Sequence, residues 1–252
     1  MYFDTHTHLD DARFDKDRPS VIKKIADSGV TLLVNIGADM ESSHAGVKLA
    51  AENDFIYASV GVHPHDTEFM TDDDVEILRV LATEPKVVAI GEIGLDYYYD
   101  NSPRDLQKKW FRRQIELAKE LNLPYIVHDR DAHQDTMDII HKTGYFRGVM
   151  HCYSGSIEMM RTLVDWGFYI SFAGSVTFKN SKKAKEVASC VPIERLLIET
   201  DSPYLTPEPH RGQRNDSSMV QFVAQEIAAL RGMSQEEVAR ITLENGKRFY
   251  NI

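Results

Sequence analysis

The sequence has few cysteines, no long apolar stretch and no excess of basic residues. Its 252 residues include only two cysteines, Cys152 and Cys190, which cannot build a disulfide framework or a zinc knuckle. No apolar run approaches the roughly 20 residues that a membrane-spanning helix needs, and the first residues lack the pattern of a signal peptide. We therefore expect a cytoplasmic protein without a membrane partner.

The charge balance is acidic, with a net charge of −10 at pH 7. Such a chain is not expected to coat nucleic acid through a broad basic face. A nucleic-acid enzyme is not excluded, because bound cations and a few arginines can hold a phosphate locally. The sequence shows no sign of an obligate protein partner, and a chain of this size can act as a monomer.

No linker or low-complexity tract divides the chain, and a unit of apolar strand, polar junction and helix recurs along it. Strict alternation of short apolar strands with helices predicts a parallel sheet. Eight such units, without a Rossmann-type glycine motif after the first strand, predict a single (β/α)₈ TIM barrel domain over residues 1–252. The expected strands are 2–6, 31–36, 56–62, 87–92, 125–128, 148–151, 169–172 and 196–201. The expected helices are 16–28, 40–53, 72–83, 104–122, 132–143, 157–166, 180–189 and one or two after 215.

The helix expected at 104–122 has a clear amphipathic pattern. Leu106, Trp110, Leu117 and Leu121 recur at spacings of four and seven. This spacing places them on one face of a helix, which we predict to be the buried face. Pro103 precedes the run, where its missing N–H is harmless.

Ionisable residues gather at the C-terminal ends of the predicted strands, and in a barrel these ends form the face where active sites lie. A lone histidine there is more often structural than a ligand. Six potential ligands at equivalent positions would be costly to bury together without a cation. They predict a site for two divalent cations. Imidazole and carboxylate ligands are compatible with Mg, Mn or Zn. The six are His6, His8, Glu92, His128, His151 and Asp201.

Strand alternation and carboxylate chemistry suggest how these ligands are shared. Asp4, His6 and His8 lie on one face of the first strand, so we expect Asp4 to orient a histidine through its second ring nitrogen. Glu92 has two oxygens and can bridge both cations. On this interpretation one cation is held by His6, His8, Glu92 and Asp201, and the other by Glu92, His128 and His151.

Six motifs together resemble the TatD-like metal-dependent deoxyribonucleases, which have an amidohydrolase-like barrel. They are FDTHTHLD (3–10), GVHPH (61–65), GEIGLDYY (91–98), HDRDA (128–132), HCYSG (151–155) and ETDSPYL (199–205). All six predicted ligands match that family's metal ligands. One departure follows ETDSPYL, where the family continues approximately RG-x-x-N-x-P. Here Arg211, Gly212 and Asn215 are present, but Ser217 stands where proline is usual.

The resemblance implies DNA cleavage, including 3′→5′ exonuclease action on single strands, and hence single-stranded DNA or 3′ ends as the partner. A carboxylate-bridged cation pair suits this reaction, because it activates a water and neutralises phosphoryl charge. The expected catalytic residues are Glu92, as the bridge, and Asp201, as general base. Arg130 and Arg211 are candidates to bind phosphate.

Further contacts with substrate are less specific. His65, and after it His63, could contact substrate or protonate the leaving oxygen, although either could simply hold its loop. Tyr153 could stack on a base or ribose, or pack beside Cys152. The aromatic run 97–99 could border the substrate or pack in the core.

Three alternatives remain open. An amidohydrolase-type enzyme for a small cyclic amide, lactone or phosphoester would share the barrel and the initial H-x-H. Such enzymes often bridge their metals with a modified lysine after the fourth strand, where this chain has Glu92. RNA or an aminoacyl-tRNA ester could be the substrate instead. A metal-holding scaffold without turnover would be favoured by a missing ligand, and none is missing.

Overall fold

The computed structural model describes residues 1–252 as eight parallel strands, which follow one another in the sheet in chain order, and nine α-helices. This alternation is the (β/α)₈ TIM barrel class, so the predicted fold class is confirmed. The strands are β1 (Tyr2–Thr7), β2 (Val30–Ile36), β3 (Ile56–Val60), β4 (Val87–Asp96), β5 (Tyr125–Arg130), β6 (Gly148–Met150), β7 (Tyr169–Phe172) and β8 (Leu196–Ile198). The helices are α1 (Arg18–Asp27), α2 (Met40–Glu52), α3 (Asp72–Leu81), α4 (Arg104–Glu120), α5 (His133–Thr143), α6 (Ile157–Trp166), α7 (Lys182–Cys190), α8 (Val220–Arg231) and α9 (Gln235–Tyr250).

Two strand ends differ from the prediction in a way that matters for the site. Strand β4 continues to Asp96, because its pairing with β5 persists as far as Asp96 opposite Arg130. Strand β8 ends at Ile198, so Asp201 lies beyond it, with a left-handed φ of 54° that no regular strand contains. The expected strand 196–201 was therefore too long, and the expected strand 87–92 was too short.

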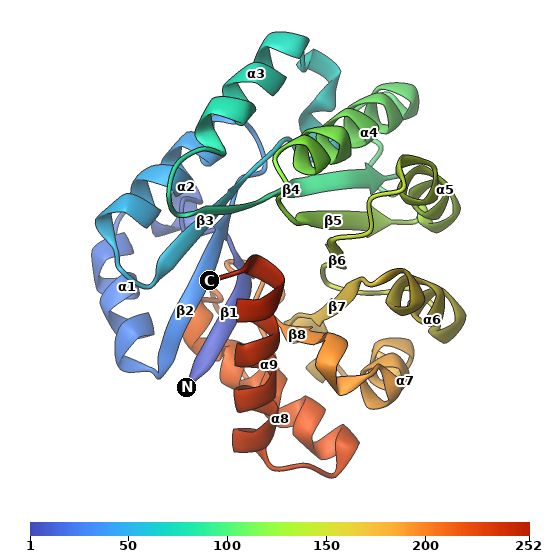
Figure 1. The fold of residues 1–252 in the computed structure, drawn as a ribbon. Coiled ribbons are helices and arrows are strands. Elements are labelled where there is room, and N and C mark those ends of the chain that lie inside the picture. The colour runs from blue at the N-terminus through green and yellow to red at the C-terminus, as the bar shows by residue number, and fades with distance from the viewer. The chain divides into compact units, whose positions relative to one another are not determined.

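The chain forms two compact units, and the first comprises residues 1–35 and 152–252. In it β1 pairs with β2, and β7 pairs with β8. Helix α9 packs against β1, as Figure 1 shows where the red helix lies beside the dark blue strand. The rings of Phe3 and Tyr250 make this contact, with their centroids 5.8 Å apart, and the Tyr250 hydroxyl donates to the carbonyl of Thr5. The start of β1 is thereby fixed to the last helix.

The second unit comprises residues 36–151 and holds β3 to β6 with helices α2 to α5. Helix α4 packs against β4 (Figure 1), and its buried face includes two glutamines. Gln114 accepts from the N–H of Val62 and donates to its carbonyl. Gln107 does the same for Asp96. Helix α4 therefore fixes the backbone just after β3 and at the end of β4.

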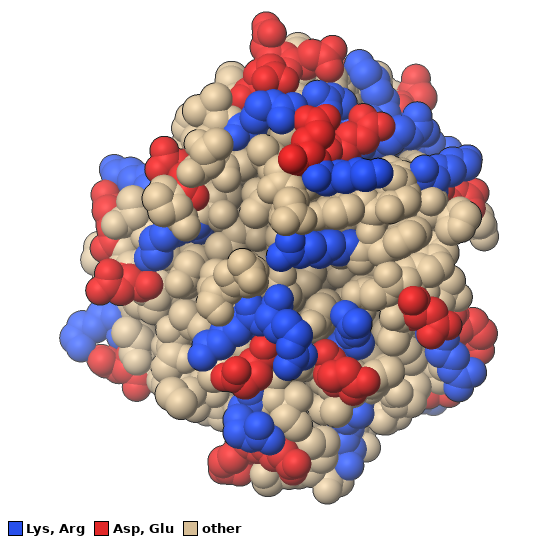
Figure 2. All heavy atoms as spheres, in the orientation of Figure 1, with Lys and Arg blue, Asp and Glu red and all other residues tan.

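No helix is long and apolar enough to cross a membrane. On the face drawn in Figure 2, lysine and arginine side chains are scattered among acidic and uncharged ones. Both cysteines are free thiols.

Candidate metal centre

Three of the predicted ligands converge within the first unit. His6 lies on β1, His8 follows it, and Asp201 follows β8. The Nε2 atoms of the two histidines are 3.3 Å apart, and each lies 3.6 Å from Asp201 Oδ1. Around a tetrahedral ion with ligand bonds of about 2.0–2.1 Å, neighbouring donors are separated by about 3.3 Å. Two imidazole nitrogens and a carboxylate oxygen at these separations fit a divalent cation.

Backbone hydrogen bonds between β1 and the segment after β8 create this convergence. Asp201 N–H donates to the carbonyl of His6 over 2.9 Å, and His8 N–H donates to the carbonyl of Ser202 over 2.7 Å. The hydroxyls of Thr7 and Ser202 are 2.5 Å apart. The ends of the chain's first and last strands are thus bound together, which explains why residues separated by almost 200 positions act as neighbours.

Asp4 does not have the role predicted for it. Its carboxylate accepts from the N–H and hydroxyl of Thr200, at 2.8 and 2.5 Å, and from the backbone N–H of His6 at 3.4 Å. Burial raises the pKa of Asp4 to about 7, although hydrogen bonds from Ser217 and Thr200 oppose the rise. The prediction that Asp4 orients an imidazole ring was wrong, because it holds backbone and hydroxyl groups.

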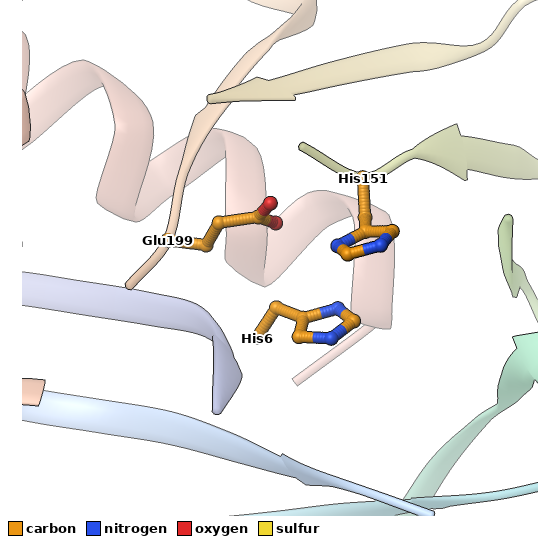
Figure 3. A group of neighbouring side chains, drawn as sticks. All are labelled: His6, His151 and Glu199. Atoms are coloured by element: carbon orange, nitrogen blue, oxygen red, sulfur yellow. The ribbon is translucent and has the colours of Figure 1, made fainter. Parts of the chain in front are cut away.

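A second buried carboxylate in this unit is Glu199. It accepts from the N–H of Cys152 and the hydroxyl of Ser171, both at 2.6 Å. Figure 3 shows His6 and Glu199 projecting in the same direction from β1 and from the segment after β8; it also labels His151, which follows β6. Glu199 therefore connects the segment after β8 to β7 and to the backbone of Cys152.

The other three predicted ligands converge within the second unit, around Glu92 on β4. One oxygen of Glu92, Oε1, accepts from His128 Nδ1 and His151 Nε2, each at 2.8 Å. Burial raises the pKa of Glu92, but the charges of His151 and His63 and the imidazole hydrogen bonds outweigh it and hold that pKa well below its ordinary value. An ionised carboxylate shared by two imidazoles is a donor set that suits a divalent cation.

Sequence reasoning gave too small a role to His63. Its Nε2 lies 3.6 Å from Glu92 Oε1, and His63, Glu92 and His128 form a group whose ligand atoms lie within 4.8 Å of one another. Burial and the charge of His128 hold the pKa of His63 well below its ordinary value. A neutral imidazole can bind a metal, so His63 is a further candidate ligand.

Sequence reasoning missed Asp96, which is buried at the end of β4. Its Oδ2 accepts from His128 Nε2 at 3.0 Å and from His65 Nε2 at 2.9 Å. Burial raises the pKa of Asp96, and the hydrogen bonds from His128 and the backbone outweigh this and lower it. A carboxylate behind a ligating imidazole fixes the orientation of its ring. Asp96 lies four residues after Glu92, so alternation places both side chains on the same face of a strand. A predicted strand that continued beyond residue 92 would therefore have indicated Asp96.

The predicted substrate residues have different surroundings. Arg130 is exposed, with its guanidinium 4.1 Å from the centre of the Tyr98 ring. Arg211 is exposed, with its guanidinium 3.7 Å from the ring of Phe178. Tyr153 is only 4% exposed, and its hydroxyl donates to the carbonyl of Ser156. Tyr153 is thus packed in the protein, and its stacking on a base or ribose stays a prediction.

Several known proteins are similar to this chain over nearly its whole length. A crystal structure of the TatD homologue YjjV from Escherichia coli superimposes with a TM-score of 0.94 at 30% identity, and covers 100% of this chain and 98% of that one. The metal-dependent hydrolase YabD of Bacillus subtilis, itself uncharacterised, is 48% identical over 100% of both chains. The 3′-5′ ssDNA/RNA exonuclease TatD of Shigella flexneri is 35% identical over 99% of both.

The chain is thus a metal-dependent hydrolase with a (β/α)₈ fold. The sequence profile of the TatD-related DNases matches residues 3–251. The chain belongs to that family, as its motifs predicted.

Proposed function

We propose that this hydrolase is a deoxyribonuclease that cleaves DNA phosphodiester bonds, acting as a 3′→5′ exonuclease on single strands. The observation that carries the proposal is the buried Glu92 carboxylate, one oxygen of which accepts from two imidazoles in the second unit. The family's description as DNases and the exonuclease name of the Shigella relative support a nucleic-acid substrate.

The proposed centre holds two divalent cations, Mg, Mn or Zn. The strand ends of a (β/α)₈ fold form its active face, and the proposed ligands lie on strands or just after them. Bound there, the cations would activate a water and neutralise phosphoryl charge. The proposed ligands are His6, His8, Glu92, His128, His151 and Asp201.

The proposed site residues then have distinct roles. Glu92 provides the shared carboxylate, and Asp201 takes the proton of the attacking water as general base. Arg130 and Arg211 donate to phosphate oxygens, and His65 contacts the leaving group. We assign both units to one catalytic domain, residues 1–252, because the family profile spans both. Two free thiols fit a reducing cytoplasm.

Degradation of end-labelled single-stranded DNA by the metal-reconstituted protein tests this proposal. We expect a 3′→5′ ladder that EDTA and Glu92→Ala both abolish. Glu84→Ala, at an exposed glutamate in the loop before β4, is the matched control and should leave the ladder intact. A labelled RNA strand in parallel shows whether ribose is accepted.

Two results would overturn the proposal. Cleavage that survives Glu92→Ala would exclude this centre as the site of hydrolysis. Absence of DNA cleavage with Mg, Mn and Zn, from folded protein that binds metal, would favour a small amide, lactone or phosphoester, or an aminoacyl-tRNA ester, as the substrate.

A further inference from the structure

Two adjacent tyrosines after β4 are exposed to solvent. Tyr98 is 58% exposed and Tyr99 is 54% exposed, and their rings meet edge to face with centroids 4.9 Å apart. The preceding residue, Tyr97, differs, because its hydroxyl donates to Asp135 over 2.6 Å and its ring is half-buried. Tyr97 is thus held by a hydrogen bond in the protein, whereas the rings of Tyr98 and Tyr99 are largely open to solvent.

Arg130, at the end of β5, lies against both exposed rings. Its guanidinium carbon is 4.1 Å from the centre of the Tyr98 ring and 4.7 Å from that of Tyr99. No ion pair involves Arg130, whereas Arg104, which lies over Tyr97, is paired with Asp100. The guanidinium is thus oriented by the tyrosines while its N–H donors remain available to an anion.

One buried carboxylate connects these side chains to the histidine cluster. Asp96 Oδ1 accepts from the N–H groups of Tyr98 and Tyr99, at 3.0 and 2.9 Å. Its other oxygen accepts from His128 and His65, and the His65 ring meets that of Tyr99 at 5.4 Å. The exposed tyrosines are therefore rigidly placed next to a proposed metal ligand, all within the second unit.

We propose that Tyr98, Tyr99 and Arg130 form a binding surface for an unpaired nucleobase and its phosphate, an inference that rests on the proposed function. An exposed aromatic ring stacks on any base, because every base has a π face. The guanidinium edge matches phosphate oxygens. Bases in a duplex are already stacked on one another, so this surface selects single-stranded or frayed ends.

Steady-state kinetics of the metal-loaded enzyme test this inference with three substrates. They are a single-stranded oligonucleotide, an oligonucleotide of equal length with abasic sites, and bis(p-nitrophenyl) phosphate, a diester without a base. The test variant is Tyr98→Ala/Tyr99→Ala, and Tyr98→Phe/Tyr99→Phe retains the rings. Tyr57→Ala is the matched control, because Tyr57 lies near the start of β3 beside Lys86, at the opposite end of the strands.

For the double alanine variant we expect KM for the normal oligonucleotide to rise about 5- to 150-fold. Its KM for the abasic strand and for the small diester, which have no base to stack, should rise much less. The phenylalanine variant and Tyr57→Ala should behave as the wild type with all three substrates. This combination would distinguish base stacking from damage to the metal centre.

The inference fails if the wild type degrades DNA and the double alanine variant has an unchanged KM. It also fails if the variant loses activity on all three substrates equally, since the tyrosines would then act through Asp96 and not on a base. If the wild type hydrolyses the diester but no DNA, the proposed function fails and this inference fails with it.

Discussion

The two units hold their candidate ligands differently. In the first, the ligand atoms of His6, His8 and Asp201 lie 3.3–3.6 Å from one another. In the second, Glu92 is joined to two imidazoles by contacts of 2.8 Å. The first set has the separations of donors around an ion, whereas the second set is already connected by hydrogen bonds.

This difference indicates which of the two sets of candidate ligands depends more on a cation. The second unit has a continuous network in which Asp96 and Glu92 both contact His128. Such a network orients its side chains before a metal binds. We therefore expect the first unit's ligands to be the more sensitive to the loss of any one member.

Removing one histidine from each unit tests this comparison and should give the largest effect. His8→Ala leaves only two donors in the first unit's set and should lower the hydrolysis rate about a thousandfold. His63→Ala leaves Glu92 with two imidazoles and should cost only about tenfold. The rate of hydrolysis of a small diester and the metal content by inductively coupled plasma mass spectrometry are measured for both variants. Equal losses would show that the networks are equally robust.

A glycine in β4 tests how the second unit achieves its short contacts. Gly94 has a φ of 149°, and a Cβ there would lie 1.9 Å from the carbonyl oxygen of His128. Gly94→Ala should therefore lower the free energy of unfolding by about 3 kcal/mol or more. Gly144→Ala is the control, because Gly144 has a φ of 62° but open space around it, and should cost about 1 kcal/mol. Thermal or urea denaturation measures the free energy of unfolding of both variants. Similar losses of stability would mean that β5 moves easily to make room for the added Cβ of residue 94.

The sequence was sufficient to predict the strand count, because alternation is a local signal, whereas the six ligands indicated by strand-end chemistry stay a prediction. It also predicted helix α4 and the burial of Trp110 and Leu117, but not the whole of its buried face. The apolar spacing placed Leu106 and Leu121 on the buried face, but both are half-buried. The fully buried Gln107 and Gln114 look like surface residues in a hydropathy pattern.

The role of Asp96 could not be predicted for a related reason. Its partners are two histidines from other strands and two N–H groups beyond its own strand end. Those contacts depend on how far β4 pairs with β5, which propensity does not determine. The error over Asp4 has the same origin, since the rule of alternation gives the face of a side chain but not its partners.

These two buried aspartates give a sharper form of the comparison. Asp96→Asn places an amide against His65 or His128 and should weaken metal binding about 10- to 100-fold. Asp4→Asn should leave metal affinity nearly unchanged, because Asp4 contacts Thr200 and backbone groups. Competition with a chromogenic chelator measures both affinities. An unchanged affinity in Asp96→Asn would remove Asp96 from the positioning of His128.

The smallest effect is expected at the surface of the second unit, at Asp135. Hydrogen bonds from Lys108 and Tyr97 lower the pKa of Asp135 in the folded protein. A carboxylate whose pKa is lowered by folding stabilises the protein at pH values above its unfolded pKa of about 3.9. This stabilisation is lost as the pH falls through the lower pKa of the folded state. Asp135→Asn should therefore cost up to about 1 kcal/mol at pH 7, with a smaller cost below pH 4. Urea denaturation at both pH values measures the change in the free energy of unfolding, and Asp138→Asn on the same helix is the control. A change that does not depend on pH would mean that the ion pair of Asp135 contributes nothing to stability.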